Sequence, residues 1–240
     1  MNPSALQRIS IRWLPEPAYE DTETIALNVG GYFVDLRLNK NDATIQWSRA
    51  GERILLQSHP RKLSLPPTRI LAPIPRLTGL LATFRWTHII DSLDLTIPDE
   101  AYFKKLPNGD DLEIGTTPCP CKDGVPTDYE EVWRDVTSTD PGDRCWILQS
   151  ANGMTFLGRV GSNYLAIQKE INGGFAARKE DWLASEGWQV SFESDASPNL
   201  PLATAAIEAM RQRDLNMAAG DKIDVLGRQG LEAYVHDVSF

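Results

Sequence analysis

The sequence predicts an all-β protein, mainly antiparallel, with one helix close to its C-terminal end. Apolar and polar residues alternate along most candidate strands, as they do over 32–38, and this alternation places the two kinds of side chain on opposite faces. Clusters of Gly, Asn and Asp separate these short segments. Only one segment, about 202–215, has apolar residues at helical spacing. This arrangement is typical of antiparallel β-barrels or β-sandwiches.

The first half of the chain opens with a predicted strand at 9–13, where apolar and polar residues alternate. A β-hairpin is predicted over 32–47, with its turn at 39–42, because four turn-forming residues interrupt the alternation there. Gly51 and Glu52 predict a further turn before a strand at 53–57.

The second half is predicted to contain seven strands and the helix. The helix follows Pro201, and the cationic Arg211 and Arg213 near its end suit the negative end of the helix dipole. A helix after a set of strands could plug or brace one end of a barrel. The predicted strands are 145–149, 155–160, 164–170, 175–178, 188–193, 223–226 and 231–238.

Two segments fit neither strand nor helix. Residues 59–76 contain five prolines among leucines and isoleucines, which predicts a long ordered loop lying over apolar surface. That loop is either a lid over a binding site or a simple cover of a barrel. Residues 106–128 are rich in Gly, Asp, Pro and Thr and are predicted to connect the two halves. We therefore expect a first domain over 1–138 and a second over 139–240.

The composition argues against two classes of partner. The formal net charge is −9, the pI is near 4.9, and no block of Lys or Arg appears. Nucleic acids and anionic membranes are bound through clustered basic side chains, so neither is expected as a partner. No apolar run approaches the roughly 20 residues that a membrane-spanning helix needs.

The three cysteines, Cys119, Cys121 and Cys145, are predicted to be free thiols. Pro120 lies between the first two and leaves the chain little freedom to reach disulfide geometry. Free thiols are typical of a reducing compartment, and the chain also lacks an N-glycosylation sequon. We therefore expect a cytoplasmic protein.

Familiar catalytic signatures are absent from the sequence. It has no phosphate-binding G-x-x-x-x-G-K-[ST], no dinucleotide-binding G-x-G-x-x-G, no H-E-x-x-H and no G-x-S-x-G. A three-histidine metal site would need all of His59, His88 and His236, which lie in segments of different kinds. We expect no metal and no cofactor.

The segment 84–91 combines two aromatic rings, an imidazole, a guanidinium and a carboxylate. As a strand it would place Phe84, Trp86 and His88 on one face. This composition suits the wall of a pocket, and it suits equally well an amphipathic strand against an ordinary core. His88 is the candidate catalytic donor or proton shuttle, and Tyr32 is the candidate second donor.

Other residues are expected to line the same pocket. A barrel of about eight strands either fills with side chains or holds one small ligand, and both alternatives stay open. The candidate substrate-binding residues are Trp13, Trp47, Leu71, Phe84 and Trp86.

The remaining polar candidates of the first half are Asp35, Arg37 and Arg85. Both arginines are expected to face solvent or to pair with carboxylates, because alternation opposes them to apolar neighbours. Segment 129–135 carries three carboxylates, but adjacent carboxylates rarely face each other across a substrate. We expect it to be a solvated strand or turn.

Six short motifs occur in the order found in a known family: R-I-S-I-R-W-L at 8–14, G-Y-F-V-D-L at 31–36, W-S-R-A-G-E-R at 47–53, R-W-T-H at 85–88, Y-E-E-V-W-R-D at 129–135 and G-R-V-G at 158–161. Together they resemble the fungal Hri-type proteins, named after a yeast protein that interacts with a casein kinase 1 isoform. The resemblance spans nearly the whole chain. It implies two lipocalin-like β-barrels in tandem.

Similar proteins also occur in fungal secondary-metabolite clusters, where lipocalin-like proteins act as cofactor-free cyclases, including hetero-Diels–Alderases. The leading hypothesis is therefore a cofactor-independent cyclase that holds a hydrophobic substrate in a reactive arrangement inside an aromatic-lined barrel. The alternatives are a noncatalytic, kinase-interacting adaptor with filled barrels and a passive carrier of a hydrophobic metabolite. An open cavity of several hundred Å³ favours the enzyme or the carrier, and a filled interior favours the adaptor.

Overall fold

The computed structural model describes residues 2–59, 81–138, 144–195, 199–212, 220–225 and 231–239. The all-β, antiparallel fold class predicted from alternation is confirmed. The first half contains β1 (Ser4–Trp13), β2 (Thr22–Val29), β3 (Tyr32–Asn39), β4 (Ile45–His59), β5 (Leu81–Trp86), β6 (Ile90–Asp91), β7 (Asp99–Lys105), β8 (Asp111–Cys119), the short helix η1 (Pro120–Lys122) and β9 (Val125–Asp135). The second half contains β10 (Cys145–Ser150), β11 (Thr155–Val160), β12 (Asn163–Lys169), β13 (Phe175–Leu183), β14 (Gly187–Glu193), α1 (Ala203–Gln212), β15 (Lys222–Val225) and β16 (Leu231–Ser239).

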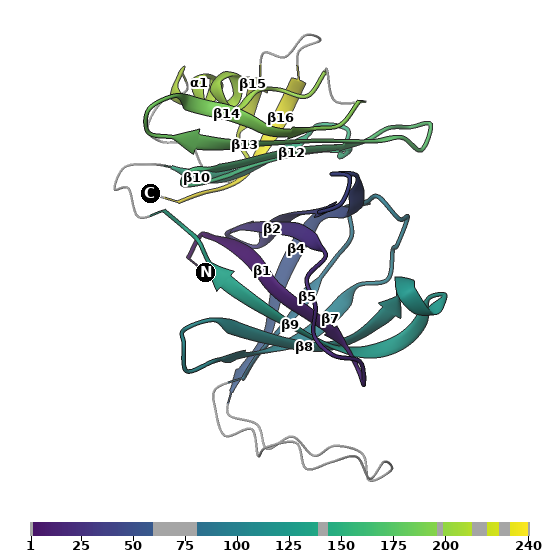
Figure 1. The fold of residues 1–240 in the computed structure, drawn as a ribbon. Helices are drawn as coiled ribbons and strands as arrows, with labels where there is room; N and C mark the ends of the chain where they lie inside the picture. The colour runs from purple at the N-terminus through teal and green to yellow at the C-terminus, as the bar shows by residue number, and fades with distance from the viewer. Residues whose placement is uncertain are drawn as a thin grey trace.

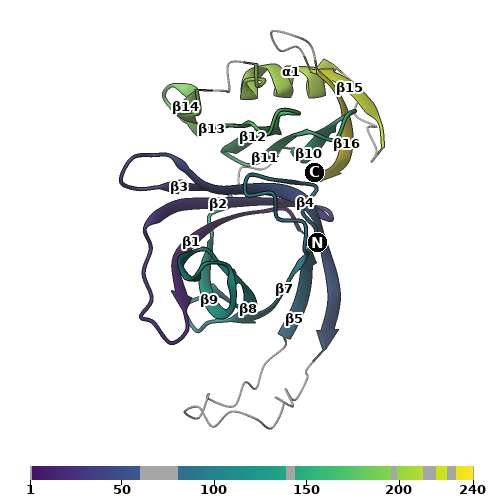
Figure 2. The ribbon, with the colours of Figure 1, turned by 90° about the vertical axis from the view of Figure 1, so that its right-hand side faces the viewer.

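Strands of the first half close into a barrel. Their order is β3-β2-β1-β9-β8-β7-β5-β4, and an additional pairing of β3 with β4 completes the ring. The short strand β6 lies on the far side of β4, where Ile90 pairs with Ala50. Figure 2 shows this ring of strands end-on. The predicted first barrel is therefore present, and its interior is the natural place to search for a site.

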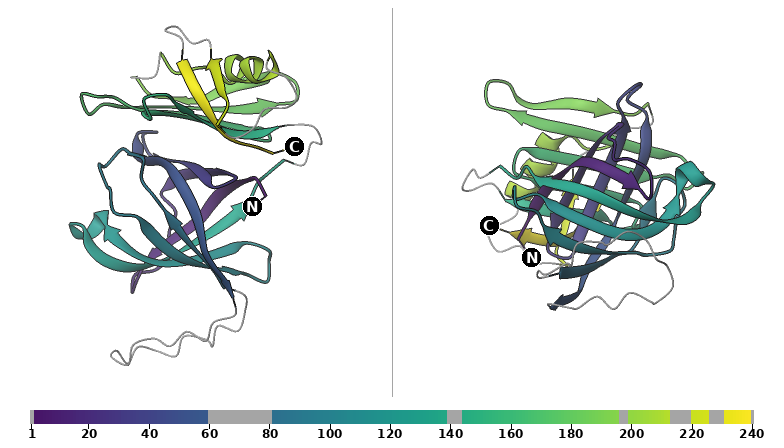
Figure 3. Two further views of the ribbon diagram at one scale, coloured as in Figure 1. Left: turned by 180° about the vertical axis from the view of Figure 1, so that it is seen from behind. Right: turned by 60° about the horizontal axis from the view of Figure 1, so that its bottom comes forward.

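The second half forms a seven-stranded antiparallel sheet in the order β14-β13-β12-β11-β10-β16-β15. Figure 1 and the left view of Figure 3 show the sheet lying across one side of the barrel, with α1 on the face that points away from it. Among the described residues no pairing joins β14 to β15. Beneath α1 lies an apolar cluster that includes Trp146, Tyr164, Ile207 and Met210. The helix therefore braces the second sheet with the apolar face expected from its sequence, and it lies on a face of that sheet, whereas the expectation was that it would plug or brace one end of a barrel.

A second apolar cluster lies between the barrel and the second sheet, and it is the part of the core that both halves share. Each half contributes fully buried side chains to it, so neither half can expose this face without losing burial. Members from the barrel include Leu27, Val34 and Leu36, and members from the second sheet include Ile147, Phe156 and Ile167.

The orientation of β3 follows from this shared cluster. Val34 and Leu36 face the second sheet, so alternation turns Phe33, Asp35 and Arg37 into the barrel. All five side chains are buried. The outside of this barrel wall is therefore the apolar face, and the inside carries the charges.

The turn predicted at Gly51 is wrong, because β4 continues through it from Ile45 to His59. A glycine is required at position 51 for a different physical reason. A Cβ at Gly51 would overlap the backbone carbonyl of Thr87, where the chain crosses after β5. Gly51 thus permits a close approach of two backbones rather than a reversal of the chain.

The irregular connection predicted at 106–128 is also wrong, because β8 and β9 occupy most of it as a hairpin. Two other strands, β2 and β7, have no counterpart in the predicted set. Strand β2 is buried on both faces, with Thr22 and Thr24 on one and Ile25 and Leu27 on the other. Burial of both faces weakens the polar–apolar alternation from which a strand is predicted.

The helix is confirmed over Ala203–Gln212, and the predicted residues 213–215 lie outside the described part of the chain. Almost all of the proline-rich loop predicted at 59–76, including Leu71, also lies outside it. Among the described residues no helix is both long and apolar enough to cross a membrane.

Candidate functional site

A network of buried charges crosses the interior of the barrel. Glu131 on β9 accepts hydrogen bonds from Arg8 (Nη1 to Oε1, 2.6 Å) and from Arg37 (Nη1 to Oε1, 3.2 Å). Arg37 also pairs with Asp35 at 3.1 Å, and Arg8 pairs with Glu20 at 2.9 Å. Taking a charge out of water costs several kcal/mol unless it is paired. The network supplies each of these arginines with two carboxylates.

A second group of polar side chains surrounds His88, whose side chain is fully buried. Its Nδ1 lies 3.2 Å from Asp91 Oδ2, and its Nε2 lies 3.2 Å from Asp99 Oδ2. Burial acts to lower the pKa of His88, but the hydrogen bonds to the two aspartates outweigh it and raise the pKa. Trp47 donates to Asp91 (2.9 Å), and Arg49 pairs with Asp99. His88 therefore ties β6 to the start of β7.

Glu113 on β8 is a carboxyl group of a different kind. Burial and the neighbouring charge of Glu131 raise the pKa of Glu113 to about 8, which favours its neutral form. The Tyr129 hydroxyl donates to its Oε1 at 2.7 Å. Gly115 makes room for that ring, because a Cβ at Gly115 would come within 2.7 Å of the Tyr129 ring.

The barrel encloses a partly open cavity of about 30 Å³. This volume has room for roughly two or three water-sized spheres at 10–15 Å³ each. Aromatic rings, guanidinium groups and carboxyl groups share the wall. The lining residues are Leu6, Ala26, Asn28, Phe33, Asp35, Arg49, Arg53, Trp86, Phe103, Glu113 and Trp133.

Two polar atoms in residues of this wall have no hydrogen-bond partner among the described residues: Asp35 Oδ1 and Trp133 Nε1. The first is an acceptor and the second is a donor. Both side chains are buried, and a buried polar atom without a partner costs about 1–3 kcal/mol. The cavity wall therefore offers one unmet acceptor and one unmet donor.

Several residues predicted for the site do gather at this end of the barrel. Trp86 is part of the cavity wall, and the ring centroid of Phe84 lies 6.0 Å from that of Trp86. Trp47 and His88 do not line the cavity, but both contact Arg49, which does. The Arg49 guanidinium carbon lies 4.1 Å from the Trp47 ring centroid, and its Nη1 lies 3.2 Å from His88 Nε2.

Two predicted site residues lie elsewhere. Trp13 is at the opposite end of β1 from the cavity-lining Leu6, and its ring centroid lies 5.7 Å from that of Tyr129. Tyr32 packs against the cluster between the two sheets, where burial and the nearby Glu52 raise its pKa. The catalytic and binding roles assigned to these residues stay predictions.

Three residues of the interior escaped prediction. Glu131 was expected in a solvated segment, yet it is 3% exposed at the centre of the charge network. Glu113 lay in the segment expected to be irregular, although a glutamate alternating with Leu112 and Ile114 is itself a signal of a strand with a polar inner face. Trp133 follows the same alternation on β9. Arg37 was expected either to face solvent or to pair with a carboxylate. It pairs with Asp35 and Glu131, and it is buried.

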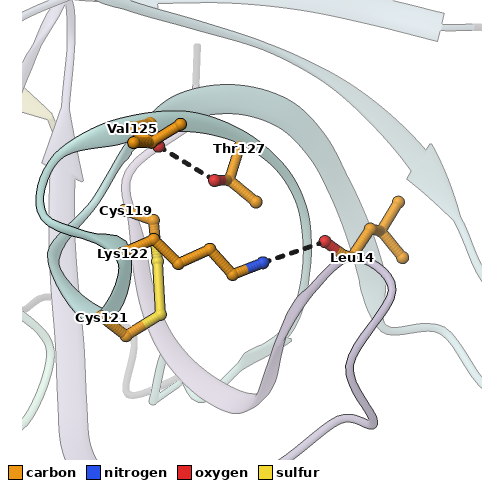
Figure 4. Close-up of a disulfide and its surroundings, with 6 residues drawn as sticks. All are labelled: Leu14, Cys119, Cys121, Lys122, Val125 and Thr127. Carbon is orange, nitrogen blue, oxygen red and sulfur yellow. Dashed lines mark hydrogen bonds between the residues drawn. A yellow bond between two sulfur atoms is a disulfide. The ribbon is translucent and has the colours of Figure 1, made fainter.

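The prediction that Cys119 and Cys121 are free thiols is wrong, because their sulfurs form a disulfide (Figure 4). The Cα atoms lie 5.3 Å apart, within the range that a disulfide spans. Pro120 starts the short helix η1, and the turn of the chain brings the two sulfurs together. The expected free thiols therefore no longer support a cytoplasmic location, which stays a prediction.

Comparison with known proteins places the chain in a family. The family model described as Protein HRI1 matches residues 4–228. The chain belongs to the HRI1 family. Among solved structures, the crystal structure of the uncharacterized protein YLR301w from Saccharomyces cerevisiae is similar, with a TM-score of 0.69, 13% identity and 99% of each chain covered. At this identity the likeness shows the fold alone. No curated protein matches the chain.

Membership of the HRI1 family confirms the resemblance drawn from the six motifs and is compatible with a ligand-binding barrel. It does not by itself assign a reaction or a partner. In the described part of the chain, no group of three His, Cys, Asp or Glu side chains is placed to hold a metal ion.

Replacing Glu113 with glutamine should flatten the dependence of stability on pH. Because the folded state raises the pKa of Glu113 to about 8, the folded state binds this proton more tightly than the unfolded state does. Stability therefore falls as pH rises from about 5 to 8, by up to about 1.4 kcal/mol per pH unit. Urea denaturation at several pH values measures the slope. The exposed Glu100→Gln variant should keep the wild-type slope, and parallel profiles for E113Q and wild type would contradict the assignment.

Proposed function

We propose that the barrel of this HRI1-family protein binds one small, flat, neutral molecule whose polar group both donates and accepts a hydrogen bond. The observation that carries this proposal is the pair of unmet atoms in the cavity wall, Asp35 Oδ1 and Trp133 Nε1. A ligand hydroxyl would donate to the carboxylate and accept from the indole N–H. A phenol or an aromatic amide has this chemistry.

The rest of the wall supports a flat ligand without charge. Phe33, Trp86 and Phe103 supply aromatic surface, on which a ring can stack. The charge of Arg49 is met by Asp99 and that of Asp35 by Arg37, and burial and Glu131 raise the pKa of Glu113 toward its neutral form, so these groups offer little that would compensate an added ion. A neutral ligand enters such a site without leaving a buried charge unpaired.

The volume of the cavity limits the size of the ligand. Sites for drug-sized molecules measure about 300–1,000 Å³, at least about ten times the volume found in this barrel. For a cofactor-independent cyclase of natural-product biosynthesis, Glu113 could serve as an acid, and Trp86 and Phe103 would supply aromatic surface for the substrate. Its polyene or polycyclic substrate would need a far larger space. A single aromatic ring also exceeds this space, so side chains of the wall must move apart to admit it. A compact molecule requires far less of this movement than a polycyclic substrate does, and its binding is therefore the better-supported function.

A noncatalytic adaptor is the second candidate. Side chains fill most of the barrel interior, which is what the adaptor hypothesis predicts. No described contact points to a kinase or to another protein as its partner. The ligand-binding proposal accounts in addition for the unmet atoms of Asp35 and Trp133, which an adaptor has no need of.

Calorimetric titration of the full chain with phenol and with toluene tests the proposal. The two molecules have similar shapes, but only phenol can meet both unmet atoms, so it should bind at least about tenfold more tightly. Trp133→Phe removes the indole donor and keeps an aromatic ring, so it should weaken phenol binding about fivefold and leave toluene unchanged. Trp182→Phe, at an exposed position on β13, is the matched control. Equal affinities for phenol and toluene, or no binding of either, would refute the proposal.

A further inference from the structure

The disulfide between Cys119 and Cys121 closes the end of the β8–β9 hairpin, away from the proposed ligand cavity. We propose that this pair is a thiol–disulfide exchange site for low-molecular-weight thiols and disulfides, and that Cys121 is the sulfur that the external thiol attacks. This site lies apart from the cavity, so the proposal does not rest on the function proposed for the barrel interior.

The two cysteines differ sharply in access. Cys119 is fully buried, in a cluster with Ile11, Trp13 and Tyr129, whereas Cys121 is exposed. Exchange proceeds by in-line attack of a thiolate on one sulfur of the disulfide, and access decides which sulfur is attacked. An external thiol therefore reaches Cys121, and Cys119 is the sulfur that leaves.

The disulfide does little to hold the hairpin together. Its cysteines are two positions apart, and the chain entropy that a crosslink removes from the unfolded state is smallest for the shortest loops. The hairpin has its own support: β8 and β9 pair up to Cys119 and Val125, and Gly124 N donates to Cys119 O at 3.0 Å. Asp123 and Gly124, both with positive φ, make the turn. Opening the disulfide thus leaves the strand pairing in place, and a reversible bond at this position is compatible with the fold.

A basic residue follows the attacked cysteine in the sequence. Lys122 follows Cys121 directly, and its side chain extends past the disulfide to donate to Leu14 O at 3.3 Å (Figure 4). A neighbouring ammonium stabilises a thiolate relative to a thiol. After reduction, this charge favours the reactive form of Cys121, which is the form needed to close the disulfide again.

The exchange balances in two steps. A thiolate of an external dithiol attacks Cys121 Sγ and forms a mixed disulfide, while the Cys119–Cys121 bond breaks and Cys119 leaves as a thiolate that takes up a proton. The second thiol of the reductant then attacks its own sulfur in the mixed disulfide and releases Cys121. Two electrons and two protons pass to the protein, and the reductant becomes a cyclic disulfide. A low-molecular-weight disulfide such as oxidised glutathione drives the reverse reaction.

The full chain, equilibrated in glutathione buffers over a roughly thousandfold range of oxidised to reduced form, tests this site. The samples are quenched with acid and their free thiols are alkylated. As the buffer becomes more oxidising, mass spectrometry should show the alkylation of Cys119 and of Cys121 falling together, in one two-electron transition within the range. Cys145→Ser is the control and should not move the midpoint. A pair that stays fully reduced or fully bridged across the whole range would overturn the proposal.

Single variants test which sulfur is attacked. Cys119→Ser leaves the exposed Cys121, which should accumulate as a mixed disulfide with glutathione. Cys121→Ser leaves only the buried Cys119, which should react at least about tenfold more slowly. Circular dichroism checks that both variants are folded, and the rate at which dithiothreitol reduces the unmodified chain gives a second measure of access. Equal rates at the two cysteines would overturn the assignment of Cys121.

Discussion

Replacing Arg37 with methionine should lower the free energy of unfolding by about 3–5 kcal/mol. Arg37 pairs with Asp35 and with Glu131 inside the barrel, and all three side chains are buried. Removing the guanidinium leaves Glu131 with Arg8 as its remaining partner and Asp35 with only the longer pair to Arg49 at 3.5 Å, so the buried negative charges are compensated less well and have no water to solvate them. The large loss of stability arises because buried carboxylates lose a partner, and not because the ion pairs themselves contribute that much net stabilisation.

Equilibrium denaturation in urea measures this loss. The control is Arg134→Met, which breaks the pair of Arg134 with Asp110, where the arginine side chain is 52% exposed. Ion pairs with a solvent-exposed partner contribute little to stability, so the control should lose far less than Arg37→Met does. Similar losses in the two variants would show that the interior charges are not shielded from solvent, contrary to the structure.

Leu27→Ala should cost about 2–5 kcal/mol, the range for removing a buried leucine side chain. Leu27 is fully buried in the cluster that joins the barrel to the second sheet. Its side chain packs next to Gly158 of β11, because a Cβ at Gly158 would lie 3.5 Å from Leu27 Cδ1. The variant therefore opens a cavity between the two halves rather than inside one of them.

The same denaturation experiment tests this packing. Leu183→Ala removes the same atoms from a leucine that is 44% exposed on β13, and its loss should be within about 0.5 kcal/mol. A loss below about 1 kcal/mol for Leu27→Ala would mean that the two halves do not share this cluster in solution.

The alternation of β3 shows both the strength and the limit of prediction from sequence. It correctly places Val34 and Leu36 on one face and Asp35 and Arg37 on the other. It does not say which face is inside, because a barrel that carries a second sheet on its outer wall buries both faces. The apolar residues face the sheet, and the charged ones face the interior, where their partners come from β4 and β9.

The strand predicted over 84–91 is correct only up to Trp86, because β5 ends there and His88 lies in the connection to β6. Its first residues have the predicted faces, and Phe84 and Trp86 lie inside the barrel. Its neighbours in the site could not be predicted in the same way. Glu113 and Trp133 become wall residues only because β8 and β9 close the ring, far along the chain from Trp86. A local sequence pattern can show that a strand has two different faces, but it does not show which residues of other strands those faces will contact.

The disulfide exposes a different limit. Counting cysteines and noting Pro120 between two of them argued for free thiols, whereas the turn at η1 brings the sulfurs of Cys119 and Cys121 together. That geometry comes from the tight turn of Pro120–Lys122, which leaves the Cα atoms of the two cysteines 5.3 Å apart and is a feature of the folded hairpin. The spacing of the cysteines alone did not contain it.

The central claim, that the barrel binds a small donor–acceptor ligand between Asp35 and Trp133, is tested most directly by the indole N–H signal of Trp133. A nuclear magnetic resonance titration of the ¹⁵N-labelled chain with phenol should move this signal in a saturable way, because Nε1 gains an acceptor that it lacks in the described structure. The signal of the exposed Trp182 should stay in place, and toluene should leave the Trp133 signal largely unchanged. A Trp133 signal that does not respond to phenol, or that moves equally with toluene, would contradict the account.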